Sequence, residues 1–382
     1  MKKKIFIVTE RRADFSRFKP IIKLIKKDRT LDYLLVVTGI HLLKKYGYSI
    51  NEIKAEKFKI YKKFKIYDSK FNKEDDGAGM SRALGQAVIK LSDILKKTKP
   101  DLILSGFDIA ANFAATVAGA HMNIPVAHIQ GGEVSGNIDE SLRHATSKFS
   151  HFHFTANLET KKRLIKMGEI SKNIYAVGCP SIDALMQEKD TSKKTIIKKF
   201  GINVEKKFLL IIQHPVTSEL NYVQKQIRET VSAISKFKLS SIFVFPNNDA
   251  GSSKIIKIIE KKKLNCARTL NLSEYKTLLK NCSVLIGNSS SGIHEALSFF
   301  KPVINIGTRQ QGRFKPKNII NVGYNSKQIF KTIVKCINDL NFLNKVKKLK
   351  NPYGDGKSSE KIIKIIKKLK LDQSVIQKQI TY

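Results

Sequence analysis

The segment from Val126 to His144 has the sequence VAHIQGGEVSGNIDESLRH. It begins with a short run of β-branched and apolar residues, which is typical of a buried strand in a parallel sheet. Three glycines follow, and then acidic and basic side chains that include Asp139, Glu140 and Arg143. Open α/β sheets bind ligands beyond the carboxyl ends of their strands. The segment therefore predicts an α/β fold with its active site at this loop, although a polar loop that caps the next helix fits the same residues.

Strand-like and helix-like segments alternate before this stretch. Residues 4–9 and 100–107 are predicted as buried strands, and the second of them leads directly to Asp108. A helix is expected from about 81 to 97, whereas the lysine-rich residues 51–73 are interpreted as peripheral. Asp108 is thus a second carboxylate expected at the end of a strand.

The strand pattern restarts in the second half, at 208–213, which leads to His214, and continues at 241–245 and 283–287. Alternation in both halves predicts an α/β chain with two Rossmann-like domains facing across a cleft. A length of 382 residues also exceeds the usual size of one core. The predicted parts are an N-terminal domain with the candidate acids at 1–185, a C-terminal nucleotide-binding domain at 186–356, and a helix and tail at 357–382 that pack back on the N-terminal domain.

The formal net charge is +39, from 71 basic and 32 acidic residues. The lysines are spread along the chain without interleaved aromatic residues, so we expect an anionic small substrate and no nucleic-acid partner. The four cysteines lie far apart, with no CxxC pair and no histidine at metal-ligand spacing, so neither structural zinc nor a disulfide framework is expected. No apolar stretch suits a signal or a membrane span, so we expect a cytoplasmic protein without membrane partners.

Residues 287–295 carry a candidate phosphate site, with three consecutive serines before a helix expected to begin near Ile293. Free N–H groups and hydroxyls at a helix N-terminus bind anions, and guanidinium groups pair with phosphate oxygens. Glu295, one turn inside the expected helix, suits two ribose hydroxyls. An ordinary serine-capped helix fits the same serines. The predicted diphosphate site comprises Ser289, Ser290, Arg309 and Arg313.

Four strings resemble the motifs of one family, the hydrolysing UDP-N-acetylglucosamine 2-epimerases of sialic-acid synthesis and their relatives. The likeness runs in order from Thr9 to about Gly356. The strings are HIQGGEVSG with IDESLRH within 128–144, GNSSSG at 287–292, INIGTRQ with GR within 304–313, and NPYGDG at 351–356.

The resemblance implies a glycosyltransferase-B-type fold whose cleft holds a UDP-sugar. It also implies that UDP is eliminated, that a glycal-type intermediate forms, and that water then adds to give free N-acetylmannosamine. Arg12 and His214 would contact the diphosphate region, and Arg309 the nucleotide. Ser289 and Ser290 would contact the phosphates, and Glu295 the ribose. The resulting assignment is Asp108, Glu133, Asp139 and His214 as catalytic residues, and Arg12, Gln130, Arg143, Ser289, Ser290, Glu295, Arg309 and Arg313 as substrate-binding residues.

The sequence departs from the family pattern in three places. Gln130 stands where the family usually has glutamate, and an amide cannot act as a base. Glu10 and Arg11 replace a glycine and a threonine in the first turn. The family's Gly-Asp-Arg triplet appears as Gly106-Phe107-Asp108, so the role of Asp108 assumes a one-residue insertion. Our hypothesis is that Asp108, Asp139 and Glu133 carry the acid and base chemistry, while Gln130 orients the substrate.

Other functions fit the same sequence. A hydrolysing epimerase could act on a 2,4-diacetamido-6-deoxy sugar nucleotide, and a non-hydrolysing epimerase would return UDP-N-acetylmannosamine. A non-catalytic nucleotide-sugar binder and an ordinary glycosyltransferase are alternatives from other classes. The family implies a homodimer or higher homo-oligomer. No metal and no cofactor are expected, because arginines can neutralise the diphosphate.

Overall fold

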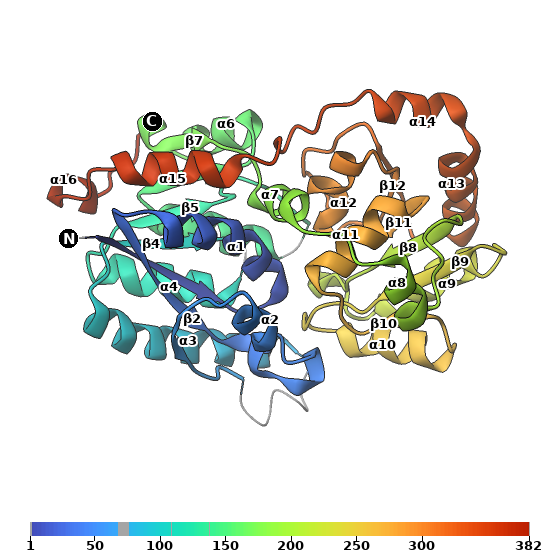
Figure 1. Ribbon diagram of the computed structural model, residues 1–382, viewed down its shortest axis with the longest axis horizontal. Coiled ribbons are helices and arrows are strands. Elements are labelled where there is room, and N and C mark those ends of the chain that lie inside the picture. The colour runs from blue at the N-terminus through green and yellow to red at the C-terminus, as the bar shows by residue number, and fades with distance from the viewer. Residues whose placement is uncertain (1, 68–75, 108, 137, 382) are drawn as a thin grey trace. The chain divides into compact units, whose positions relative to one another are not determined.

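The computed structural model describes residues 2–67, 76–107, 109–136 and 138–381. They form two compact units, each a parallel β-sheet with helices on both faces (Figure 1). The predicted α/β class with two parallel-sheet domains is confirmed. Unit 1 comprises Met1–Glu133, Ile138–Ala184 and Tyr353–Tyr382, and unit 2 comprises Val134–Asn137 and Leu185–Pro352. The short segment 134–137 therefore belongs with residues far along the chain.

Unit 1 has, among the described residues, a seven-stranded sheet in the order β3-β2-β1-β4-β5-β6-β7. Its strands are β1 (Lys3–Thr9), β2 (Leu31–Val37), β3 (Ile60–Lys63), β4 (Leu102–Gly106), β5 (Val126–Ile129), β6 (Phe152–Thr155) and β7 (Ile174–Ala176). Its helices are α1 (Arg12–Lys27), η1 (Gly39–Leu42), η2 (Lys44–Tyr46), α2 (Ile50–Ala55), α3 (Gly77–Thr98), α4 (Ala110–His121), α5 (Ile138–Phe149), α6 (Leu158–Lys166), η3 (Ser171–Asn173), α15 (Ser358–Lys368) and α16 (Gln373–Ile376), and α7 (Pro180–Gln187) runs into unit 2.

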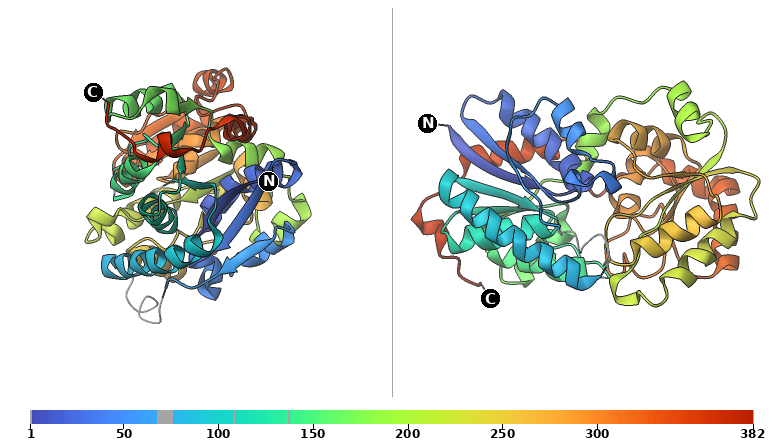
Figure 2. Two further views of the ribbon diagram at one scale, coloured as in Figure 1. Left: turned by 90° about the vertical axis from the view of Figure 1, so that its left-hand side faces the viewer. Right: turned by 90° about the horizontal axis from the view of Figure 1, so that it is seen from below.

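The alternation of side chains along β1 divides unit 1 into two cores. Ile5 and Ile7 pack with the apolar faces of α1 and α15, and Phe6 and Val8 pack with α3 and α4. Figures 1 and 2 show α15 in red beside α1 in blue. On the opposite face, the alanines of α4 let that helix approach the sheet closely. The residues after Tyr353 therefore complete the core of unit 1 that lies between the sheet and α1.

Unit 2 has, in the part of the chain that the structure describes, a six-stranded sheet in the order β10-β9-β8-β11-β12-β13. Leu209 and Ile211 of the central strand face α9, α10 and α13, while Phe208, Leu210 and Ile212 face α8 and α11. The strands are β8 (Phe208–Ile212), β9 (Ser240–Val244), β10 (Cys266–Ala267), β11 (Val284–Gly287), β12 (Val303–Ile306) and β13 (Ile319–Val322). The helices are α8 (Lys193–Phe200), η4 (Thr217–Glu219), α9 (Val223–Ile234), α10 (Ser252–Lys261), α11 (Leu272–Asn281), α12 (Ser290–His294), η5 (Ala296–Phe299), α13 (Ser326–Asn338) and α14 (Leu340–Lys347).

Three local predictions are wrong. Residues 51–73 are not simply peripheral, because Ile53, Phe58 and Ile66 are buried in the cores of unit 1, although the edge strand β3 between them is mostly exposed. α3 starts at Gly77 rather than near 81, since the side chain of Asp76 accepts a hydrogen bond from the Gly79 amide and caps the helix earlier. α12 starts at Ser290 rather than near Ile293, so Glu295 is its C-cap residue.

No helix in the described ranges is both long enough and apolar enough to cross a membrane.

Candidate active site

The loop after β5 is held in a strained, closely packed path. Gln130 has a φ of +61°, which is uncommon for a residue other than glycine. Its backbone N–H donates to the carbonyl of Phe154 on β6, and the donor and acceptor atoms are 2.8 Å apart. Gly132 has a φ of +78°, and a Cβ atom there would lie 2.4 Å from the Thr160 carbonyl oxygen, so only glycine fits. Strain of this kind persists where surrounding structure enforces it, often at functional sites.

The side chains of Gln130 and Glu133 meet inside this loop. Both are almost fully buried, and Nε2 of Gln130 donates to Oε1 of Glu133 across 3.1 Å. Oε1 of Gln130 is buried without a hydrogen-bond partner among the described residues. The backbone carbonyl of Glu133 accepts a hydrogen bond of 2.9 Å from Nη1 of Arg143, which is also buried. Three of the predicted site residues, Gln130, Glu133 and Arg143, are therefore brought together.

The N-terminal turn of α5 carries Asp139 and Glu140, where carboxylates face the positive end of the helix dipole. His144 follows one turn later, and its Nε2 lies 3.7 Å from Oε1 of Glu140. Burial, followed by the charge of Arg143, lowers the pKa of His144, although Glu140 raises it. Asp139 thus lies on the same helix as Arg143. Asp108, the other predicted acid of this half, lies outside the described residues.

Arg12 begins α1 and forms an ion pair with Glu52 of α2. Its Nε lies 2.7 Å from Oε1 of Glu52, and its Nη1 donates to the Tyr46 carbonyl at 3.1 Å. Beside it, the buried carboxylate of Glu10 accepts hydrogen bonds from the Tyr67 hydroxyl at 2.5 Å and the Ala111 amide at 2.9 Å. Glu10, one of the departures from the family pattern, therefore ties the first turn to the N-terminus of α4.

In unit 2, Asn288 links the ends of three strands. Gly287 precedes it with a φ of +131°, and a Cβ atom there would lie 2.0 Å from the Ile212 carbonyl oxygen, so the turn packs directly on β8. Oδ1 of Asn288 accepts from the His214 amide at 2.7 Å, and its Nδ2 donates to the His214 carbonyl at 2.9 Å. The Asn288 carbonyl accepts from Gln310 Nε2 at 2.8 Å. His214 is therefore held by its backbone.

The serine run continues from this turn. Ser289 is the N-cap of α12, and its hydroxyl accepts from the Ser291 amide at 3.4 Å. Ser290 is the first residue of the helix. Tyr275 of α11 hydrogen-bonds to the Ser291 hydroxyl and donates to Oε2 of Glu295 at 3.4 Å. Burial, followed by the charge of Glu295, raises the pKa of Tyr275 well above its usual value. The tyrosine therefore stays a donor toward Glu295.

The two predicted arginines approach this region differently. Nη1 of Arg309 donates to the Asn288 carbonyl at 3.3 Å, beside the serine run, and its Nη2 lies 3.8 Å from Oδ2 of Asp249. Nε of Arg313 instead donates to the Val134 carbonyl at 3.0 Å. Arg309 is thus adjacent to the serine run, whereas Arg313 is bonded to Val134.

Sequence reasoning missed Asn288, Tyr275 and Gln310. Asn288 directly precedes the serine run, so its position at the end of a strand could have marked it. Tyr275 contacts the serine run from α11, and Gln310 donates to the Asn288 carbonyl from beyond β12, and no local pattern signals such contacts. In the described residues, no three or more histidine, cysteine, aspartate or glutamate side chains are grouped so that they could hold a metal ion.

Comparison with known proteins identifies the family. The family model described as UDP-N-acetylglucosamine 2-epimerase matches residues 23–367. The chain belongs to this family. The resemblance predicted from the four sequence strings is therefore confirmed, and the chain is a member of a family of nucleotide-sugar epimerases.

Two curated relatives match most of this chain. One is a UDP-N,N'-diacetylbacillosamine 2-epimerase (hydrolyzing) of Legionella pneumophila, 35% identical over 99% of this chain and 99% of its own. Another is a UDP-N-acetylglucosamine 2-epimerase of Neisseria meningitidis serogroup B, 32% identical over 87% of this chain and 86% of its own.

Among solved structures, a Neisseria meningitidis UDP-GlcNAc 2-epimerase bound to UDP-GlcNAc superposes with a TM-score of 0.81, covering 96% of this chain and 100% of its own at 21% identity. At that identity the likeness establishes the fold, and the predicted glycosyltransferase-B-type fold is confirmed.

Proposed function

We propose that this epimerase-family chain is a hydrolysing 2-epimerase whose substrate is UDP-N,N'-diacetylbacillosamine, a 2,4-diacetamido-6-deoxy sugar nucleotide. The match to the Legionella enzyme, which spans nearly the whole of both chains, carries the proposal. The UDP-N-acetylglucosamine substrate predicted first from the sequence has weaker support, because the relative with that activity matches less of the chain at lower identity. Homo-oligomerisation and cytoplasmic residence stay predictions.

The proposed reaction has two steps. A base removes the C2 proton while the C1–O bond breaks and UDP leaves with the electron pair, so that a C1=C2 double bond forms. Water then adds its hydroxyl to C1, and a proton returns to C2 from the opposite face. Both steps need acid–base groups near C1 and C2 and positive charge near the departing diphosphate.

The residue roles follow the two halves of the chain. Glu133, Asp139 and Asp108 are proposed to move the protons, and Arg143 keeps the Glu133 backbone in place through the 2.9 Å bond to its carbonyl. Arg12 would contact the diphosphate. Its guanidinium carries five donors, so the pairing with Glu52 leaves capacity for a phosphate oxygen.

In unit 2, Ser289 and Ser290 are proposed to bind the phosphates, Glu295 the ribose and Arg309 the nucleotide. Arg313 is proposed to add positive charge for the diphosphate. Two observations support this half. Asn288 fixes the His214 backbone beside the serine run, and Arg309 donates to the carbonyl of the same asparagine. His214 would act on the diphosphate from this position.

Gln130 offers a buried acceptor that suits an acetamido sugar. Its amide nitrogen faces the Glu133 carboxylate, so its Oε1 is left as a buried acceptor without a partner among the described residues. A buried acceptor of this kind costs free energy unless a donor meets it. The N–H of an acetamido group is such a donor, whereas a glutamate at this position would add charge instead.

The test is a direct comparison of substrates. The purified chain is incubated in deuterated water with UDP-N,N'-diacetylbacillosamine and, separately, with UDP-N-acetylglucosamine, and the products are identified by NMR. We expect free UDP, a 2-epimerised free sugar with deuterium at C2, and a kcat/KM at least about 10-fold higher for the diacetamido substrate. Equal or higher kcat/KM for UDP-N-acetylglucosamine would reject the substrate, and a UDP-linked product would reject hydrolysis.

A further inference from the structure

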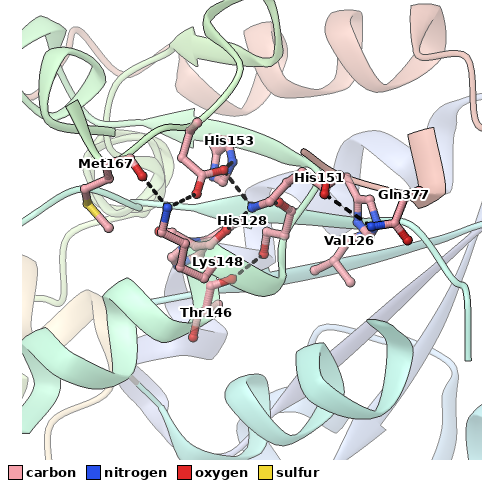
Figure 3. A network of polar contacts seen from close by, with 12 residues as sticks. Val126, His128, Thr146, Lys148, His151, His153, Met167 and Gln377 are labelled. Atoms are coloured by element: carbon pink, nitrogen blue, oxygen red, sulfur yellow. Dashed lines mark hydrogen bonds and ion pairs between the residues drawn. The ribbon is translucent and has the colours of Figure 1, made fainter. Parts of the chain in front are cut away.

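The segment after α15 lies against the outer strands of unit 1 and is held there by polar contacts. The Thr381 amide donates to the Gly168 carbonyl at 3.0 Å, and Nε2 of His151 lies 3.2 Å from the Ile376 carbonyl oxygen. Figure 3 shows the surrounding network, in which His128 of β5 and His153 of β6 come from neighbouring strands, His151 directly precedes β6, and Lys148 of α5 lies beside them. Among the charged residues of this segment, Lys378 has the most buried side chain.

The ammonium of Lys378 meets three acceptors. Nζ donates to the carbonyls of Ser147 at 3.0 Å and Ser150 at 2.9 Å, and to Oε2 of Glu169 at 2.7 Å. The side chain of Lys378 is 16% exposed and that of Glu169 is 1% exposed. α5 ends at Phe149, so the two carbonyls lie at its C-terminal end, where a cation stabilises a helix. Lys378 therefore attaches the segment to α5 itself.

α5 connects this attachment to the candidate active site. Its buried Arg143 donates to the Glu133 carbonyl, and the Ser147 hydroxyl lies 3.0 Å from Nδ1 of His128 on β5. β5 leads directly to Gln130 and the glycine-rich loop. A shift of the C-terminal end of α5 would therefore move Arg143 relative to Glu133, because a helix transmits displacement along its axis.

Lys148 provides an internal comparison. Its Nζ lies 3.3 Å from Oε1 of Glu169 and it donates to the Met167 carbonyl, so it is a second cation on the same carboxylate. Among the described residues, its ammonium has no hydrogen bond to the Ser147 or Ser150 carbonyl. Removing Lys148 therefore removes charge near Glu169, whereas removing Lys378 also releases the end of α5.

We propose that Lys378 is a positioning residue for the epimerase reaction: its ammonium fixes the C-terminal end of α5 and so holds Arg143 against the loop that carries Glu133. The kinetic part of this inference rests on the proposed function, since it assigns Glu133 to the chemistry. The structural part, that the loop depends on Lys378, does not.

Hydrogen exchange of the full chain, read by mass spectrometry, tests the structural part. Wild type is compared with Lys378→Met, Lys378→Arg and Lys148→Met. Lys378→Met is expected to raise exchange about 10-fold in α5 and in residues 130–133, Lys378→Arg to restore most of the protection, and Lys148→Met to leave both regions as in wild type. Faster exchange confined to residues 373–381, or the same change in Lys148→Met, would overturn the proposal. Lys378→Gln, which keeps two donors, replaces the Met variant if that variant does not fold.

Kinetics test the consequence for the reaction, at a temperature where circular dichroism shows every variant folded. Lys378→Met should lower kcat about 5-fold or more while UDP affinity stays within about 2-fold, because no proposed nucleotide contact is on α5 or in the loop 130–133: Arg12 is on α1, and the others lie in unit 2. A double-mutant cycle with Arg143→Lys should be non-additive, whereas a cycle with Ser290→Ala should be additive. Additivity with Arg143→Lys would overturn the coupling. If the wild type turns over no UDP-sugar, the proposed function fails, and hydrogen exchange still decides the role of Lys378.

Discussion

Nε2 of Gln130 donates to Oε1 of Glu133 across 3.1 Å, within a loop where both side chains are buried. The carboxyl oxygen of Glu133 accepts this hydrogen bond, so the contact fixes the orientation of the Gln130 amide and sets a neutral side chain beside Glu133. The family's usual glutamate at position 130 would place two carboxylates in contact instead. At the end of β5, Gln130 therefore provides a hydrogen-bond donor where the family's glutamate would provide a negative charge.

Gln130→Glu is expected to make stability depend on pH. Two adjoining carboxylates resist joint ionisation, so the pair should hold a proton and its pKa should rise in the folded state. A raised carboxyl pKa gives stability that is present at low pH and lost as pH rises through the folded pKa. The free energy of unfolding of the variant relative to wild type should fall by about 1–3 kcal/mol between pH 4 and pH 8, measured by urea denaturation. Gln130→Met, which adds no charge, is the control, and an equal pH slope in both variants would contradict the prediction.

The sequence predicts the parts of the site that lie next to each other along the chain. The loop after β5 and the serine run after β11 are recognisable because polar residues and glycines directly follow apolar strands. The edge strand β3 is not, because its lysines face solvent and its apolar signal is weak. Lys378 and Glu169 are 209 residues apart, and nothing in either local pattern indicates their contact.

Asn288→Ala should weaken both stability and nucleotide binding. The substitution removes two hydrogen bonds to the His214 backbone, at 2.7 Å and 2.9 Å, and leaves those buried backbone groups without their partner. We expect a loss of about 2–3 kcal/mol in the free energy of unfolding. We also expect UDP affinity, measured by calorimetry, to fall about 10-fold, because His214 and the serine run lose their alignment.

Asn281→Ala is the matched control for Asn288→Ala. Asn281 donates one hydrogen bond, from Nδ2 to the Thr277 carbonyl of its own helix. It should cost about 1 kcal/mol or less and leave UDP affinity unchanged. If Asn288→Ala destabilised the chain yet bound UDP as wild type does, the two hydrogen bonds from Asn288 to the His214 backbone would serve folding alone.

Asp14 should make the wild type lose stability as pH rises above about 4. Burial raises the pKa of Asp14 to about 6, although hydrogen bonds from the Glu10 and Arg11 amides lower it. The folded state therefore keeps a proton that the unfolded chain releases, and the associated stability is lost as pH rises through about 6. Asp14→Asn cannot titrate, so its deficit relative to wild type should narrow by about 2 kcal/mol between pH 4 and pH 8. A deficit for Asp14→Asn that stayed constant across this range would show that Asp14 is ionised throughout.

Glu169 should contribute stability of the opposite pH dependence. Burial raises the pKa of Glu169, but the hydrogen bonds from His153 and Lys378 outweigh it and hold the pKa at about 2. A carboxyl pKa lowered in the folded state gives stability that is present above the unfolded pKa of roughly 4.3 and lost as pH falls toward 2. Glu169→Gln should therefore cost about 3 kcal/mol at pH 7, because it leaves the buried Lys378 ammonium without its anion, and the cost should shrink between pH 5 and pH 3.

Glu159→Gln separates this effect from the general loss of a negative charge. Glu159 pairs with Arg163 at 3.6 Å on an exposed helix face, where an ion pair contributes about 0.3–0.5 kcal/mol. Equilibrium unfolding of both variants at pH 3, 5 and 7 gives the comparison. A Glu169→Gln deficit that is independent of pH, or no larger than that of Glu159→Gln, would mean that the buried carboxylate is not held ionised by Lys378 and His153. A deficit that follows the expected pH course would show that the ion pair joining the segment after α15 to α5 is intact at neutral pH, which is the condition that the positioning of Arg143 requires.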